Sequence, residues 1–402
     1  MGFIKKITQD EARRCPQCAV ASCLPGCPLG IDIPGFIRLL REGETALALE
    51  RIKKENPFPA ICGRICPAPC EQACVFHADG EPIAIRALER FASDFGPKGT
   101  VPKMGTAPFG KKVAVIGSGP AGMSAAYYLA KMNLSVTIFE AAHQPGGFLR
   151  YAIPEFRLPQ KVLDEQFSQL KSLGVQIQTD VVFGATLMID ELFMGGFSAV
   201  LLATGASLPC FSDLPGSNLT GVYYDVEFLN RLHAVNKADV PAAARQQRIA
   251  ANKTVIVGCG PAAFDAARLS VRLGSGTSVV FEGFEEQAGV DAEILKDSKE
   301  EGVEIHSMKA LEIAGDDSGF VRGVKCRKLD VVEGKDGLKL GASMDEPILL
   351  EAQTVIIANG QRPSPSGINS IDKVFTCAHS GSVVEAIANG KAAAQKIIQF
   401  LA

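Results

Sequence analysis

The stretch KVAVIGSGPAGMSAAYYLAKMNLSVTIFE (Lys112–Glu140) decides the fold of this chain. An apolar run leads into a glycine turn, a helix-forming segment follows, and a second apolar run ends at Glu140. This order is that of a dinucleotide-binding βαβ unit. Gly117 permits the tight turn, Gly119 lets the backbone approach a pyrophosphate, and Gly122 lets helix and strand pack closely. The pattern predicts a nucleotide site at the start of the helix.

Other residues of this unit join the expected site. Pro120 and Ala121 complete the turn at the helix N-terminus, whose partial positive charge favours phosphates. Glu140 lies 23 residues after Gly117, where a carboxylate can bind ribose hydroxyls. The later strand VLLATG ends in a tight turn at Gly205, which we include among the cofactor-binding residues.

A related unit returns as KTVIVGCGPAAFDAARLSVRLGSGTSVVFE (Lys253–Glu282). Gly258, Gly260 and Ala263 stand in the three glycine positions, and Glu282 ends the second strand. The segment FEGFEEQAG that begins at Phe281 has three glutamates and no basic residue. Because a carboxylate repels a 2′-phosphate, the sequence favours NAD(H) over NADP(H). The alternative is a Rossmann unit that has lost its nucleotide.

Eight of the 12 cysteines lie in the first 74 residues. They form two sets: Cys15, Cys18, Cys23, Cys27, and Cys62, Cys66, Cys70, Cys74. One interpretation is a disulfide-stapled secreted module. The start MGFIKKITQDEARR has no apolar core of a secretory signal, so we expect a cytoplasmic chain with reduced thiols. Dense cysteines then indicate a metal.

The spacing of these cysteines favours iron–sulfur clusters over zinc. Only Cys15 and Cys18 have the two-residue gap of a zinc knuckle, and the other gaps are three or four residues. Cys27 precedes Pro28, as in a ferredoxin run whose last cysteine serves the other cluster. Eight cysteines could hold two [4Fe-4S] clusters, although Cys62 could be a bystander. The scattered remainder is interpreted as small buried apolar residues: Cys210, Cys259, Cys326 and Cys377.

Composition excludes several classes of function. The chain is 47% hydrophobic and 21% charged, with a net charge of −3, which argues against nucleic acid or an anionic membrane as partner. No apolar run is long enough to span a membrane, so we expect no membrane insertion. We also predict no dedicated acid or base residue, because the cofactors would carry the chemistry.

Together, these pieces resemble the small subunit of glutamate synthase. They are also similar to the N-terminal half of dihydropyrimidine dehydrogenase, its separate bacterial NAD-dependent subunit, and the large subunit of the electron-bifurcating ferredoxin:NADP oxidoreductase. The matching segments cover nearly the whole chain: CPQCAVASCLPGCP (15–28), NPFPAICGRICPAPCEQAC (56–74), PIAIRALERF (82–91), VAVIGSGPAGMSAAYYLA (113–130), QPGGFLRYAIPEFRLP (144–159) and VVEAIANGKAAA (383–394).

The resemblance implies FAD in the first unit, a nicotinamide cofactor in the second, and two [4Fe-4S] clusters in the N-terminal region. One cluster would take Cys15, Cys18, Cys23 and Cys74. The other would take Cys27, Cys66, Cys70 and the carboxylate of Glu89. Cys62 would then be unliganded. The segment containing Gly147 and Leu149 would lie along the flavin.

Three departures from the family pattern stand out. The two arginines that usually follow the second strand of the nicotinamide unit are absent. His379 stands where the family has an aspartate that accepts hydrogen bonds from the flavin ribityl chain, and a neutral imidazole accepts only one. The stretch between Gln361 and Phe375 is short, so another subunit could complete the rim of the flavin site.

The expected fold is α/β: an N-terminal all-α iron–sulfur domain followed by two Rossmann-like domains, the second inserted in the first. A linker rich in Gly and Pro near 96–110, and the strand TVIIANG (354–360), suggest the division. The expected domains are 1–105 for two clusters, 110–215 for the first part of the FAD domain, 216–350 for NAD(P), and 351–402 for the second FAD part.

The predicted function is electron transfer as one subunit of a hetero-oligomeric redox complex. NADH bound along Gly258, Gly260 and Glu282 would reduce the flavin, and the clusters would pass single electrons to partner subunits. Two alternatives stay open. One is a flavin-based bifurcating subunit. The other is a non-catalytic iron–sulfur relay with a dead nicotinamide site.

Overall fold

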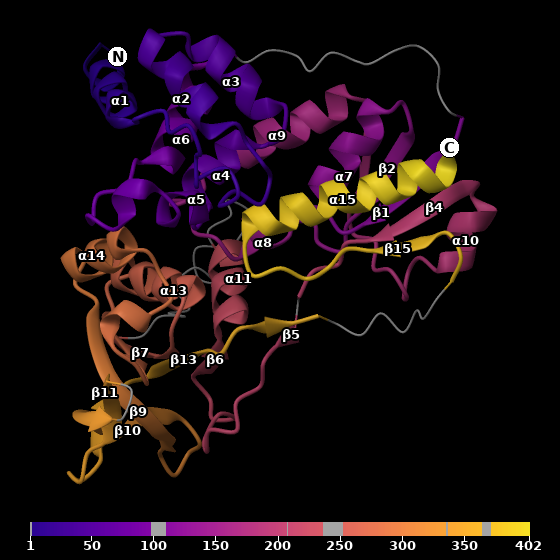
Figure 1. Ribbon diagram of the computed structural model, residues 1–402. Coiled ribbons are helices and arrows are strands. Elements are labelled where there is room, and N and C mark those ends of the chain that lie inside the picture. Colours follow the sequence, from indigo (N-terminus) through magenta and orange to yellow (C-terminus); the bar gives the residue numbers. More distant parts are fainter. Residues whose placement is uncertain (1, 98–109, 207, 236–251, 335–336, 364–370) are drawn as a thin grey trace. The chain divides into compact units, whose positions relative to one another are not determined.

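The computed structural model describes residues 2–97, 110–206, 208–235, 252–334, 337–363 and 371–402. They form two compact units (Figure 1). The first contains Met1–Arg150, Glu155–Gly205 and Pro363–Ala402, and the second contains Tyr151–Pro154 and Ala206–Arg362. The second unit is therefore an insertion, as predicted. The predicted linker near 96–110, and the expected domain end at 105, lie largely outside the described residues.

The first part of the first unit is helical, which confirms the predicted all-α N-terminal region. Its elements are α1 (Gly2–Arg14), α2 (Ile33–Glu42), α3 (Thr45–Lys53), α4 (Pro59–Ile65), α5 (Pro69–Gln72), the 3-10 helix η1 (Val75–His77) and α6 (Ile85–Phe95). Asp32 caps α2 by accepting a hydrogen bond from the Gly35 N–H at 3.0 Å. Gly43, with φ of 86°, ends α2 in the left-handed conformation.

A parallel five-stranded sheet forms the rest of the first unit, in the order β15-β4-β1-β2-β3. Its elements are β1 (Lys112–Ile116), α7 (Pro120–Lys131), β2 (Ser135–Phe139), α8 (Phe148–Tyr151), α9 (Gln160–Ser172), β3 (Gln176–Gln178), α10 (Ile189–Met194), β4 (Phe197–Leu202), β15 (Val374–Thr376) and α15 (Val383–Leu401). The yellow α15 lies along α7 (Figure 1). A Cβ at Gly390 would meet the Ala121 carbonyl oxygen at 2.2 Å, so only glycine permits this approach.

Helix α15 and the helical region contact each other within the first unit. The Tyr128 hydroxyl of α7 donates to the Glu55 carbonyl at 2.8 Å. Lys391 of α15 forms an ion pair with the Glu55 carboxylate. These contacts join the cysteine-rich helices to the first nucleotide-binding fold.

The second unit is built on an eight-stranded sheet, with the main order β11-β10-β9-β8-β7-β13-β6 and β12 paired to β10. Its elements are β5 (Leu208–Pro209), β6 (Val222–Tyr224), α11 (Asp225–Val235), β7 (Lys253–Gly258), α13 (Pro261–Arg272), β8 (Gly276–Phe281), η2 (Glu285–Gln287), α14 (Ala292–Glu300), β9 (Glu304–Gly315), β10 (Val321–Gly334), β11 (Gly337–Ala342), β12 (Ile348–Glu351), β13 (Thr354–Ala358) and β14 (Gln361–Arg362). None of the described helices is long and apolar enough to cross a membrane.

The position of β13 corrects one expectation. The sequence placed residues 351–402 in the returning part of the first domain. Instead, β13 pairs in parallel with β7 and β6, in the centre of the second sheet. All five residues of β13 are buried and four of them are apolar, and such a strand fits a central position in either sheet. The chain returns to the first unit only from Pro363.

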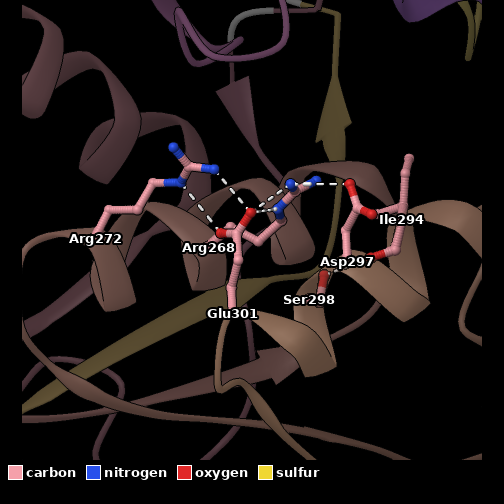
Figure 2. A network of polar contacts seen from close by, with 6 residues as sticks. All are labelled: Arg268, Arg272, Ile294, Asp297, Ser298 and Glu301. Carbon is pink, nitrogen blue, oxygen red and sulfur yellow. Dashed lines mark hydrogen bonds and ion pairs between the residues drawn. The ribbon is translucent and has the colours of Figure 1, made fainter.

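A polar network joins α13 to the end of α14 (Figure 2). The Arg268 guanidinium is buried and donates to Glu301 at 2.6 Å and to Asp297 at 3.1 Å. Arg272 donates to the same Glu301 carboxylate at 2.7 Å. Burial raises the pKa of Glu301, but the hydrogen bonds and charges of the two arginines outweigh it and lower the pKa to about 2.

We expect Glu301→Gln to destabilise the second unit by about 1–2 kcal/mol at pH 7, because Arg268 loses its anionic partner. The pKa of Glu301 is lower in the folded than in the unfolded chain. Its stabilisation is therefore present above about pH 4.5 and disappears as the pH falls toward 2. Urea unfolding of the wild type and Glu301→Gln at several pH values measures this.

Glu300→Gln is the control. It removes an exposed carboxylate one residue away and should change the free energy of unfolding by less than about 0.5 kcal/mol. Equal destabilisation by both variants would contradict the role of Glu301 in this network. So would a difference in unfolding free energy between wild type and Glu301→Gln that does not decrease below pH 4.5.

Candidate cofactor sites

The N-terminal cysteines line two cavities, each of about 350–360 Å³ including the part open to solvent. The first is lined by four cysteines: Cys15, Cys18, Cys23 and Cys74. Cys74 follows α5, whereas the other three lie on the loop between α1 and α2. The structure thus brings together residues almost sixty positions apart in the sequence.

The second cavity is lined by Cys27, Cys62, Cys66, Cys70 and Glu89. Asn56 and Val384 also line it. Glu89 lies on α6 and is buried, and its Oε1 accepts a hydrogen bond from Asn56 Nδ2 at 2.7 Å. The cysteines of the two sequence sets are therefore mixed, with Cys27 facing the second cavity and Cys74 the first.

The arrangement of these donors fits a metal cluster better than a single metal ion. In the described part of the chain, no three His, Cys, Asp or Glu side chains converge on a point where one metal ion could bind. A cubane instead presents irons at its corners to ligands arranged around it. Four donors line the first cavity and five line the second, so the donor sets suit one cubane each.

The electrostatics of these donors also suit a bound cationic centre. Burial raises the pKa of Cys23 to about 11 and that of Cys66 to about 12. Burial likewise raises the pKa values of Cys27 and Cys70, and it raises that of Glu89 to about 8. Bound iron would supply the positive charge that deprotonates a coordinating thiol.

The two cavities lie next to each other. Ile33 and Ile85 line both of them. The second cavity also touches α15 through Val384. The order within the first unit is therefore α15, second cavity, shared isoleucines, first cavity.

The first glycine turn has the expected geometry at the carboxyl end of β1. Gly117 has φ of 101°, and a Cβ there would meet the Ala203 carbonyl oxygen at 2.4 Å. A Cβ at Gly122 would lie 2.0 Å from the Gly117 carbonyl oxygen. At Gly119 a Cβ would meet nothing within 4 Å, so open space faces this residue at the start of α7. Pro120 and Ala121 form the first turn of α7.

Ser118 ties the parts of this site together. It is fully buried, and its backbone N–H donates to Glu140 Oε2 at 2.9 Å while its hydroxyl also bonds that oxygen. The same hydroxyl accepts from the Gly146 N–H at 2.8 Å. A Cβ at Gly147 would lie 3.1 Å from the Gly119 Cα. The segment expected along the flavin therefore packs directly on the glycine turn.

The remaining predicted residues of the first site lie at the same sheet edge. Gly205 follows β4, with φ of 67°. His379 is exposed and lies just beyond β15, where the Cys377 N–H donates to the Leu202 carbonyl at 2.9 Å. Leu149 is buried on α8, so its side chain packs in the protein. Carboxyl ends of parallel strands are where doubly wound sheets bind nucleotides.

The second unit repeats this design. Gly258 has φ of 126°, and a Cβ there would meet the Ala358 carbonyl oxygen at 2.3 Å. The N–H of Gly260 donates to the Ala288 carbonyl at 2.7 Å, and a Cβ at Gly289 would lie 3.5 Å from the Gly260 Cα. Ala263 is buried in α13. The segment containing Ala288 and Gly289 thus packs on the second glycine turn, as the segment containing Gly147 packs on the first.

The acid of the second site has a partner that the sequence window did not contain. Glu282 is exposed at the end of β8, and its carboxylate lies 3.3 Å from the Lys309 Nζ. Lys309 lies on β9, which pairs in parallel with β8. The NAD(H) expectation rested on the absence of a basic residue near Glu282. The segment that begins at Phe281 has none, but the fold brings Lys309 next to the Glu282 carboxylate.

Sequence reasoning missed three residues of these sites. Ser118 sits between two glycines of the motif, and Asn56 precedes a proline, so both had a local signal. Lys309 had none, because the pairing of β8 with β9 places it. Cys62, expected to be unliganded, lines the second cavity. Of the four cysteines expected to be buried, Cys326 is buried, Cys210 and Cys377 are half-buried, and Cys259 is exposed in the second glycine turn. The last expectation was wrong because this turn faces solvent.

Comparison with protein families assigns both parts of the chain. Residues 111–386 match the family described as pyridine nucleotide-disulphide oxidoreductase. The chain belongs to this family. Residues 1–100 match the domain described as dihydropyrimidine dehydrogenase domain II, 4Fe-4S cluster. This oxidoreductase therefore combines an iron–sulfur domain with a nucleotide-binding flavoprotein fold, which confirms the resemblance and the enzyme class inferred from sequence.

Three curated relatives are named as a chain or subunit of a redox enzyme. The "Glutamate synthase [NADPH] small chain" of Mycobacterium tuberculosis is 31% identical over 99% of this chain and 89% of that protein. The "NAD-dependent dihydropyrimidine dehydrogenase subunit PreT homolog" of Salmonella typhi is 36% identical over 66% of this chain and 62% of that protein. The "NADPH-Fe(3+) oxidoreductase subunit beta" of Geobacter sulfurreducens is 31% identical over 87% and 52%, respectively.

Solved structures agree on the fold. FprA from Mycobacterium tuberculosis is 16% identical, with a TM-score of 0.58 over 73% of this oxidoreductase and 84% of that chain. A 2-naphthoyl-CoA reductase is 18% identical, with a TM-score of 0.57 over 92% and 50%. At these identities the likeness concerns the fold alone. It supports the predicted pair of Rossmann-like domains.

Proposed function

We propose that this oxidoreductase carries electrons from NADH through FAD and two [4Fe-4S] clusters to a partner subunit. The first unit would hold FAD and both clusters, and the second would hold the nicotinamide nucleotide. Bound FAD would take an electron pair from the nicotinamide and release single electrons to the clusters. The relatives named as redox subunits support a hetero-oligomeric setting.

The observation that carries the proposal is the order of the sites in the first unit. Helix α15 follows His379 at the expected flavin site, and its Val384 lines the second cavity. Ile33 and Ile85 line both the second cavity and the first. Val75, which lines the first cavity, is 50% exposed, and Val20, two residues after Cys18 in the sequence, is 89% exposed. Electrons would enter beside α15 and leave near this exposed surface toward the partner.

In the second cavity, one cluster would be held by Cys27, Cys66, Cys70 and Glu89. In the first cavity, the other cluster would be held by Cys15, Cys18, Cys23 and Cys74. Each set lines a single cavity, which supports this division. Ser118 would position Glu140 toward the ribose of FAD, and the open space at Gly119 would admit the pyrophosphate.

NADH is favoured over NADPH because Glu282 stands where the ribose would bind. Its carboxylate can accept ribose hydroxyls and would repel a 2′-phosphate. Lys309 is already paired with this carboxylate, so its charge is compensated. The neighbouring Glu286 adds negative charge to the same loop, whereas Glu285 is paired with Lys299.

An anaerobic titration tests the relay. We expect about two equivalents of NADH, which supply about four electrons, to bleach the flavin absorbance of the reconstituted protein and to produce the signals of both reduced clusters in low-temperature EPR. NADPH should act at least about tenfold more weakly, because about 1.4 kcal/mol of charge repulsion suffices for that ratio. If neither nucleotide reduced a flavin-containing protein, electrons would enter elsewhere and the second unit would be a scaffold.

A further inference from the structure

The second cavity offers one donor more than a cubane needs. Five side chains with metal-binding atoms line it, and a [4Fe-4S] cluster takes four. Cys27, Cys66 and Cys70 are thiols from three separate segments, which leaves one iron for either Glu89 or Cys62. Both of these are buried, with Cys62 only 1% and Glu89 7% exposed.

Cys62 and Glu89 line the same cavity next to a close approach of α4 and α6. A Cβ at Gly63 would lie 2.6 Å from both the N and the Cα of Arg90, so the two backbones touch there. Gly63 directly follows Cys62, and Arg90 directly follows Glu89. Cys62 also lies one helical turn before Cys66, whose N–H donates to the Cys62 carbonyl at 3.0 Å. The surplus thiol therefore shares a helix face with an expected ligand.

Asn56 lines the same cavity as Cys62 and Glu89. It is fully buried, and its Nδ2 donates to Glu89 Oε1 at 2.7 Å. Its Oδ1 accepts from the Phe58 N–H at 3.0 Å, which fixes the orientation of the amide. This hydrogen bonding uses one carboxylate oxygen, and a carboxylate can ligate iron through the other.

We propose that Cys62 is an alternative ligand for the iron that Glu89 would hold. Cys62 would bind this iron when the Glu89 carboxylate releases it. The inference rests on the proposed second cluster and names one more of its ligands. The exchange is neutral in electrons. As Glu89 releases the iron, the oxygen–iron bond breaks and a sulfur–iron bond to Cys62 forms. The thiol proton passes to the released carboxylate beside it.

Iron analysis and EPR of the reconstituted full chain test this with three variants. The wild type should contain about eight irons and eight sulfides per chain. Glu89→Ala should keep about eight irons, because Cys62 replaces the carboxylate. Its second cluster should show changed g values and a more negative midpoint potential, since thiolate donates more charge than carboxylate. Cys62→Ala should keep the iron content and the wild-type spectrum, whereas the double variant should fall to about four irons.

Cys326→Ala, which removes a buried thiol from the second unit, is the matched control and should leave iron and spectra unchanged. Loss of half the iron in Glu89→Ala alone would overturn the proposal, as would a double variant that keeps all of it. If any of these variants lost its flavin and helical circular dichroism, the bulkier apolar pair Glu89→Leu and Cys62→Val, which also offers no metal-binding atom, would replace it, with the same expectations. A wild type with about four irons or none would instead refute the two-cluster function itself.

Discussion

Replacing Gly119 by alanine should lower the affinity for FAD by about 100-fold and leave the protein folded. In the structure a Cβ at Gly119 meets nothing within 4 Å, and φ of −64° suits any residue. The methyl group would instead occupy the space through which the backbone approaches the pyrophosphate. Losing about two charge-assisted hydrogen bonds to phosphate costs about 3 kcal/mol, or about 100-fold in the dissociation constant. Flavin per chain after dialysis and a titration with FAD measure the loss.

Two further glycines separate this effect from a defect in folding. Gly122→Ala places a Cβ 2.0 Å from the Gly117 carbonyl oxygen, so it should disturb the turn and lower the melting temperature as well. Gly276→Ala meets only the Asn252 carbonyl oxygen, at 3.6 Å, and should change neither FAD binding nor melting. The apo form of Gly119→Ala should melt within a few degrees of the wild type, since alanine is the weaker N-cap by about 1 kcal/mol or less. Normal flavin content in Gly119→Ala would place the pyrophosphate elsewhere.

Local patterns account for the parts of the fold that were predicted correctly. The strand, glycine turn and helix of each Rossmann unit are specified within thirty consecutive residues, and both appear as expected. Helix α2 ends at Gly43 because the left-handed cap needs a residue without a Cβ. The family resemblance then connected Cys74 to the first set and Cys27 to the second, which spacing alone left open.

Contacts between distant segments account for the rest. The apolar strand β13 suits a central position in either sheet, and only its pairing with β7 and β6 assigns it to the second. Cys62 was set aside because nothing in its neighbourhood of the sequence shows that α6 brings Glu89 beside it. The same limit affects the nucleotide preference. A window around Glu282 contains only acids, whereas the adjacent strand contributes Lys309.

Replacing Glu282 by glutamine should shift the preference of the second unit from NAD+ toward NADP+ by about 100-fold. The neutral amide oxygen would accept ribose hydroxyls more weakly than the carboxylate, which costs about 1.5 kcal/mol or roughly tenfold in NAD+ affinity. Its repulsion of a 2′-phosphate would also vanish, and Lys309, 3.3 Å away in the wild type, would become available to the phosphate. Calorimetric titration with the oxidised nucleotides measures both affinities without electron transfer.

Lys309→Met shows whether this ion pair is the cause. In the wild type the Lys309 charge is compensated by Glu282, so its removal should change NADP+ affinity by only about twofold. In the Glu282→Gln background the same change should abolish the gain in NADP+ affinity, because the lysine would then be the partner of the phosphate. The two substitutions are therefore expected to be strongly non-additive. Glu286→Gln removes an equal charge from the same loop and controls for long-range electrostatics. Additive effects, or an equal shift from Glu286→Gln, would mean that the loop's total charge sets the preference and that the pair of Glu282 and Lys309 does not.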